Sequence, residues 1–224
     1  MKKYELTEQT IVVNNVTLYR IRAINDFSDV SNGDLGGYIE NEGNLSQEGY
    51  AWVYNNAKVY GNAKVYGNAM VYGNALVCGD AKVYGDACVY NGARVSGNAK
   101  VYGGAEVSGN AKVYSGALVY GNAKVYENAK VCGNAEVYGE ALVCGNADVR
   151  MNGDYIVFKN WWSSGRYFTW TRSNNMWKVG CFLGTGEQLT ERARKDGPLT
   201  YREYKRVVNY VESILEDERN DNIQ

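Results

Sequence analysis

The sequence contains no histidine among its 224 residues. Histidine is the commonest general base and the commonest metal ligand in proteins, and it activates the nucleophile in Ser-His and Cys-His pairs. Without histidine, the chain cannot form a site that uses a histidine general base, a histidine metal ligand or a Ser-His or Cys-His pair. We predict no catalytic residues, no metal site and no cofactor.

Other classes of protein are disfavoured because the chain lacks long apolar runs, a large net charge and paired cysteines. No stretch approaches eighteen consecutive apolar residues, and the opening MKKYELTEQTIVV shows no small-residue cleavage site. Lys and Arg number 24 against 25 Asp and Glu, so the net charge of -1 gives no general attraction to nucleic acid or to a membrane. Five cysteines form an odd set without CxxC spacing, which predicts reduced thiols. We expect a soluble cytoplasmic protein that binds neither membrane nor nucleic acid.

The chain is rich in one repeated phrase of six residues. Ala recurs in steps of six from Ala51 to Ala147, and Val from Val53 to Val149, which makes 17 repeats of the form Ala-x-Val-y-Gly-Asn. Ala and Val are two apart and share one face of a strand, while x, often Lys, and y, often Tyr, point the other way. The Gly-Asn pair tolerates the positive φ that a sharp corner needs.

A short strand and a corner, iterated with three sides per turn, give a coil of 18 residues whose parallel strands stack at about 4.8 Å. The spacing of Val59, Ala63, Val65 and Ala69 resembles the hexapeptide-repeat family, in which an aliphatic residue is followed four positions later by a small one. The resemblance implies a left-handed parallel β-helix over residues 51–152. A square helix is excluded because it requires a period of five.

Because every third repeat returns to the same side of such a coil, the outward columns can be read directly. One y column is unbroken tyrosine, which we name the tyrosine ladder, and the x column beside it begins with three lysines, which we name the lysine column. The ladder comprises Tyr66, Tyr84, Tyr102, Tyr120 and Tyr138, and the lysine column Lys64, Lys82 and Lys100.

Two interpretations of the ladder compete. Stacked aromatic residues on neighbouring strands stabilise a sheet by about 0.2 to 1 kcal/mol per pair, and that is the structural interpretation. The functional interpretation is a contact surface for another copy of the chain or for a different protein, because tyrosine is enriched at interfaces. An Ala/Val interior leaves no room for a ligand, so function is expected outside the coil.

Beyond residue 152 the repeat gives way to a tryptophan-rich segment. Strands are predicted at 154–160, 166–172 and 176–182, then a helix from near Thr185. A second helix is predicted from Thr200, which has capping-box spacing to Glu203, to about Asp217, followed by a frayed tail. The sum is a small βββαα module.

Adjacent Trp161 and Trp162 would point to opposite sides of a strand, so at least one is expected outside the module's core. The tryptophan outside the core, with Arg166 nearby, is a predicted anchor for a protein partner. The alternative is that all the tryptophans of this segment build its core.

At the other end, KYELTEQTIVV and VTLYRIRAI flank Asn14-Asn15 as a predicted hairpin that caps the coil. Ile39 and Leu45 fall where the repeat phase expects Ala, so the first coil is expected to begin near Ile39. We divide the chain into a cap at 1–38, a β-helix at 39–152 and a small α+β module at 153–224.

The segment LYRIRAINDFSDVSNGDLGGYIENEGNLSQEGYAWVYNNA resembles the N-terminal part of phage and prophage hexapeptide-repeat proteins, and VGCFLGT followed by a helix resembles their terminal module. This resemblance implies a phage or prophage origin, a location in the host cytoplasm and, as a natural role, interference with a host defence factor. It brings no established activity.

We therefore predict a non-catalytic interaction protein that binds a host protein or itself and forms a dimer or trimer. One alternative is a purely structural self-assembling rod. The other is an acyltransferase-like protein, or one that holds a small anion between subunits through Lys64, Lys82 and Lys100. Acyltransferases and carbonic anhydrases built on this helix use His, and the usual insertion loop is missing because the repeats run without interruption.

Overall fold

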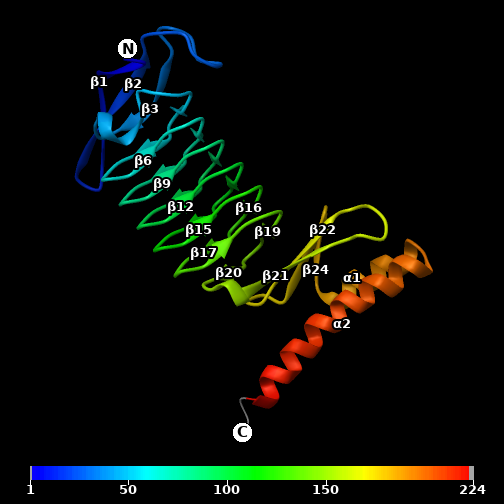
Figure 1. Cartoon of the computed structure of the whole chain (residues 1–224). Helices are drawn as coiled ribbons and strands as arrows, with labels where there is room; N and C mark the ends of the chain where they lie inside the picture. Colours follow the sequence, from blue (N-terminus) through cyan, green and yellow to red (C-terminus); the bar gives the residue numbers. More distant parts are fainter. Residues whose placement is uncertain (1, 222–224) are drawn as a thin grey trace. The chain divides into compact units, whose positions relative to one another are not determined.

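The computed structural model describes residues 2–221, and its contacts divide the chain into two compact units, Met1–Asp154 and Tyr155–Gln224. The first unit is a parallel β-solenoid of about six turns (Figure 1). Over the described residues, no helix combines the length and the apolarity needed to cross a bilayer.

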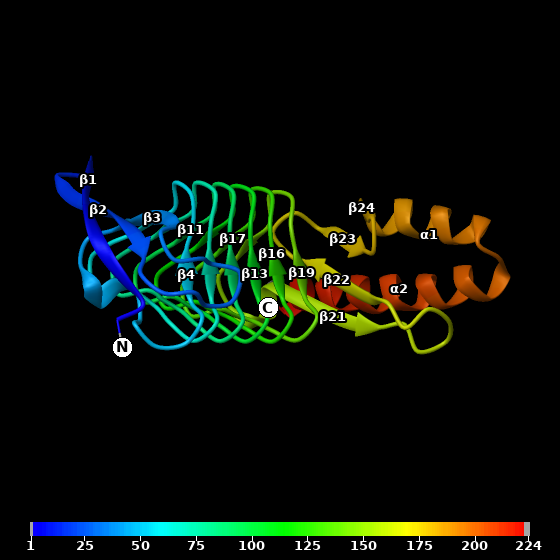
Figure 2. The same cartoon turned by 90° about the horizontal axis from the view of Figure 1, so that it is seen from above.

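Each turn of the solenoid contributes three strands of two residues, one to each of three sheets (Figure 2). The first sheet contains β5 (Lys58–Val59), β8 (Leu76–Val77), β11 (Arg94–Val95), β14 (Lys112–Val113), β17 (Lys130–Val131) and β20 (Asp148–Val149). The second contains β4 (Trp52–Val53), β7 (Met70–Val71), β10 (Cys88–Val89), β13 (Glu106–Val107), β16 (Lys124–Val125) and β19 (Leu142–Val143). The third contains β6 (Lys64–Val65), β9 (Lys82–Val83), β12 (Lys100–Val101), β15 (Leu118–Val119) and β18 (Glu136–Val137).

The predicted coil of 18 residues is confirmed by the strand register. Lys100 pairs with Lys82 on one side and with Leu118 on the other, each 18 residues away. The repeated Ala and Val side chains fill the interior and are at most 1% exposed. Corner residues take positive φ, as at Gly61 (69°) and Gly121 (70°). The parallel solenoid is thus established, and its left hand remains a prediction from the family resemblance.

The cap is a hairpin of β1 (Tyr4–Val13) and β2 (Val16–Ala23), and β3 (Leu35–Ile39) joins it to the first sheet. The hairpin turns at Asn14 and Asn15, both at positive φ, as predicted. A 3-10 helix, η1 (Glu42–Asn44), follows β3.

The predicted phase at the start of the solenoid is wrong by two residues. Ile39 pairs with Val59 and Leu45 bridges to Val65, so both residues occupy the Val position and not the Ala position. The sequence from Leu45 to Val53 spans eight residues where the repeat has six, and this shifts the phase. Gly37 takes the Ala position, where an added Cβ would lie 2.6 Å from the carbonyl oxygen of Ala57.

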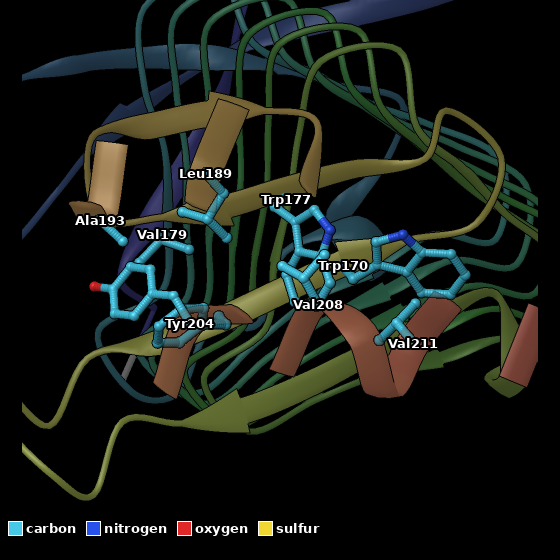
Figure 3. Close-up of a cluster of buried hydrophobic side chains, with 9 residues drawn as sticks. Trp170, Trp177, Val179, Leu189, Ala193, Tyr204, Val208 and Val211 are labelled. Atoms are coloured by element: carbon cyan, nitrogen blue, oxygen red, sulfur yellow. The ribbon is translucent and has the colours of Figure 1, made fainter. Parts of the chain in front are cut away.

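The second unit follows a short 3-10 helix, η2 (Asn152–Asp154), which belongs to the first. Its antiparallel sheet contains β21 (Tyr155–Lys159), β22 (Tyr167–Thr171), β23 (Met176–Val179) and β24 (Phe182–Gly184). We predicted three strands, and the third is divided in two because Gly180 turns the chain at φ 55°. Trp170 and Trp177 lie in the core of this unit with Val208 and Val211 (Figure 3).

The helices of this unit are α1 (Gly186–Lys195) and α2 (Pro198–Asp221). Helix α1 begins as predicted, with Thr185 as its N-cap. Helix α2 begins before Thr200 because proline suits the first helical position. The capping box predicted for Thr200 and Glu203 is therefore wrong.

Glu203 instead accepts hydrogen bonds from Arg202 and Arg206. The predicted frayed tail is also corrected. The helix continues to Asp221, and Glu218 in its last turns accepts two hydrogen bonds from Arg172. The rest of that predicted tail, residues 222–224, lies outside the described residues.

Candidate functional site

The tyrosine ladder forms on the outer face of the third sheet. The rings of Tyr66, Tyr84, Tyr102 and Tyr120 lie 4.8 to 4.9 Å apart between successive centroids, with interplanar angles of 3° to 5°. Tyr138 extends the stack at 5.2 Å and 12°. The ring spacing matches the rise of about 4.8 Å between parallel strands, so the solenoid itself sets the stack. The predicted column is confirmed, while its use as a contact surface stays a prediction.

The lysine column lies beside the ladder in a repulsive register. Lys64 pairs directly with Lys82, and Lys82 with Lys100. All three side chains are exposed, and none has an ion pair within residues 2–221. Like charges directly opposite each other destabilise a sheet. The column ends in Leu118 and Glu136, so its charge changes from positive to negative along the solenoid.

Hydrogen bonding ties the acidic end of this column to the ladder. The Tyr120 hydroxyl donates to the Glu136 carboxylate at 3.1 Å. The equivalent tyrosine column of the second sheet is less regular, because Tyr72 and Tyr90 stack at 4.8 Å but Ser108 follows them. The ladder on the third sheet is therefore the longest aromatic stack in the described part of the solenoid.

Trp52 occupies an x position that the sequence pattern places outside, yet it is only 1% exposed. The cap covers it: Phe27 contacts its ring edge-on at 5.3 Å, and Tyr4 does so at 6.0 Å. The signal was present in the sequence, since this is the one tryptophan among the 17 repeats.

The tryptophans of the second unit divide between core and surface. Trp161 is 80% exposed, which confirms that at least one of the adjacent pair lies outside the core. Trp162 is half-buried and packs on Phe168 and Tyr204 at 6.0 and 6.1 Å. Both residues lie in the turn after β21 and not on a strand. The role of this pair and of Arg166 in partner binding stays a prediction.

Sequence reasoning missed the neighbours that the fold gives to Arg166. This residue lines a cavity of about 440 Å³ together with Arg192 of α1 and Tyr204 of α2. No periodic pattern links these three positions, because a strand turn and two helices bring them together. Within residues 2–221, no three Cys, Asp or Glu side chains form a metal-binding group.

We expect the solenoid to unfold at alkaline pH when the hydroxyl groups of the tyrosine ladder ionise. Burial, followed by the charge of neighbouring ionisable groups, raises the pKa of Tyr66 and Tyr102 above the ordinary value. Burial, followed by the hydrogen bond to Glu136, raises the pKa of Tyr120. A raised folded pKa contributes stability that is complete below the unfolded pKa of about 10 and is lost as pH rises through the folded value. We expect circular dichroism to show loss of strand signal only above about pH 10. Changing these three tyrosines to Phe should move the transition to higher pH, and an unmoved transition would contradict this origin.

Comparison with known proteins supports the fold and adds little on activity. The family described as YdcK beta solenoid repeat matches residues 63–79. The "Uncharacterized acetyltransferase YdcK" of Escherichia coli strain K12 is 41% identical over 63 residues, which is 25% of this chain and 19% of that protein. The match therefore spans under a fifth of that relative's length. Both similarities support a hexapeptide-type β-solenoid.

Proposed function

We propose that this chain is a non-catalytic interaction protein whose contact surface is the tyrosine ladder together with the lysine column. The observation that carries the proposal is a stack of five tyrosines beside three lysines in directly opposed register. The stack alone has a structural explanation, but the lysine register weakens the sheet. Local violations of folding rules of this kind concentrate at functional surfaces.

The charge order of the column favours a second copy of this chain as the occupant. A two-fold axis near Tyr102 would place Lys64 of one copy opposite Glu136 of the other, and the reverse. Lys64 of each copy would then gain a carboxylate partner across the interface. Lys82 would face Leu118, and the two Lys100 side chains would lie near the axis. The two ladders would meet through their ring edges and hydroxyl groups, because the ring faces stack on one another within each ladder. Tyrosine is enriched in such interfaces.

A different protein is the second occupant we consider, and the phage resemblance makes a host defence factor its expected form. The purely structural rod would use the same self-contact. The acyltransferase alternative draws only on a relative's name and on a similarity covering 19% of that relative. It lacks a histidine base in this chain.

Self-association is tested by light scattering of the purified chain. We expect wild type to form a dimer, and the combined change of Tyr84, Tyr102 and Tyr120 to Ser to give a monomer with unchanged circular dichroism. A charge reversal gives the sharper test. Lys64→Glu or Glu136→Lys alone should weaken the dimer by about tenfold, the equivalent of about 1.4 kcal/mol, and the double reversal should restore it.

Lys112→Glu on the first sheet is the matched control. It should leave the mass of the dimer, as measured by light scattering, unchanged. If the double reversal is as weak as either single change, the two-fold arrangement is wrong. If wild type is monomeric, the second copy is excluded. A host protein captured by wild type but not by the Tyr→Ser variant would then identify the occupant of the ladder.

A further inference from the structure

The second unit contains a cavity that neither the repeat nor the proposed contact surface explains. It is a partly open cavity of about 440 Å³, a volume within the range of small-molecule sites. The start of β22, the β23–β24 turn and both helices contribute to its wall. The lining residues are Arg166, Val179, Gly180, Cys181, Phe182, Leu189, Arg192, Asp196 and Tyr204.

Two guanidinium groups flank the β23–β24 turn. Arg166 lies across Gly180, because a Cβ added there would be 3.8 Å from both the Cδ and an Nη atom of Arg166. Arg192 approaches from α1, with its guanidinium carbon 5.8 Å from the centroid of the Phe182 ring. Both arginines belong to the cavity wall, so their charges are held near one space.

Neither of these arginines has an ion pair within the described residues 2–221, although others in the same unit do. Arg172 pairs with Glu218, and Arg206 pairs with Glu203. The guanidinium donors of Arg166 and Arg192 are therefore available to a ligand in the cavity that both residues line. Guanidinium donors match carboxylate and phosphate oxygens in a bidentate fork.

The lining of the cavity combines apolar side chains with one hydroxyl group, that of Tyr204. Leu189 and Val179 are 1% and 5% exposed and lie with Tyr204 at one end of the core cluster (Figure 3). The half-buried ring of Phe182 therefore supplies most of the apolar surface that a ligand could reach. Burial raises the pKa of Tyr204, and the charges of Arg166, Asp196 and Arg192 act on the same hydroxyl. Tyr204 therefore contributes a hydroxyl group that stays protonated at neutral pH to the wall that it shares with two arginines and Asp196.

We propose that this cavity binds a small organic oxyanion. A carboxylate or phosphate group would bind Arg166 and Arg192, and an apolar body would pack on the half-buried ring of Phe182. Asp196 leaves the charged lining at a net +1, so it opposes anion binding without abolishing it. The proposal is independent of the ladder surface, since it rests on the second unit alone.

Binding is tested by calorimetry on the full chain with phenyl phosphate, benzoate and inorganic phosphate as probes. We expect phenyl phosphate or benzoate to bind, and the stronger of the two to identify the oxyanion. Inorganic phosphate should bind more weakly because it lacks the apolar body. Arg166→Ala and Arg192→Ala should each weaken binding by about tenfold or more. Asp196→Asn should tighten it, an opposite sign that a general loss of structure would not give.

Arg219→Ala, which removes an exposed arginine from the end of α2, is the matched control and should have no effect. The exposed thiol of Cys181 gives a second readout in unmodified protein, because a bound ligand should slow its alkylation. This readout also applies if an arginine variant fails to fold. Absence of binding by both organic probes, or unchanged Cys181 alkylation at saturating probe, would overturn the proposal.

Discussion

Replacing Trp52 with alanine is expected to lower the free energy of unfolding of the first unit by about 3 to 5 kcal/mol. The indole is 1% exposed although it projects from the outer side of its coil. It is covered by Tyr4 and Phe27 of the cap, which both contact its ring edge-on. Truncation would remove these ring contacts and leave a void between the cap and the first coil.

The loss should extend to the cap as a whole. The Tyr4 hydroxyl donates to the carbonyl of Leu45 at 2.7 Å, and the Lys3 ammonium donates to that of Ala51 at 2.8 Å. These bonds cover the edge of the first coil, which would otherwise offer unpaired backbone groups to another chain. We therefore expect the Trp52 variant both to unfold earlier and to aggregate more readily.

Urea unfolding followed by circular dichroism measures this effect. Trp161→Ala is the matched control because it removes the same side chain from a site that is 80% exposed, and its unfolding midpoint should stay close to that of wild type. Equal destabilisation by the two variants would show that the cap does not depend on Trp52.

The solenoid could be predicted from sequence because one short repeat determines both the local strands and corners and the way successive coils stack. The Ala-x-Val spacing decides which side chains point inward, and the corner pair decides where the chain turns. The 18-residue lap then fixes which residues are neighbours, so the stacking of Tyr84 on Tyr102 followed from counting alone. No long-range information was needed.

The predicted phase was wrong where the six-residue repeat is interrupted, at the start of the solenoid. Counting backwards in sixes places Ile39 and Leu45 at the Ala position, and only the extra two residues before Val53 move them to the Val position. A glycine at position 37 was the available clue, since only a residue without Cβ fits there.

The cavity of the second unit could not be predicted at all. Arg166 and Arg192 are 26 positions apart in the sequence, and they meet because α1 packs beside the β23–β24 turn. Trp52 was misplaced for a similar reason, because the residues that bury it come from the cap. Contacts between elements of unrelated sequence leave no periodic signal.

Ala99→Leu is expected to destabilise the solenoid by an amount at or above the upper end of about 1 to 3 kcal/mol for overpacking. Ala99 is fully buried, and the alanines one lap before and after it, Ala81 and Ala117, are buried as well. A leucine there has no space along the axis, because the laps are separated by only about 4.8 Å. It must displace the backbone and lengthen the bond from Lys82 N–H to the Ala99 carbonyl, which measures 2.9 Å.

Leucine itself is compatible with the repeat when it points outward. Leu76, Leu118 and Leu142 occupy x positions, whereas the first inward position of all 17 repeats, from 51 to 147, is alanine. Lys112→Leu therefore provides a matched control that adds the same side chain to the outer face of the first sheet. We expect its urea midpoint to remain near that of wild type while the Ala99→Leu midpoint falls well below it. A small loss in the Ala99 variant would mean that the interior yields to added volume, and the fixed register of the tyrosine ladder would then lose its physical basis.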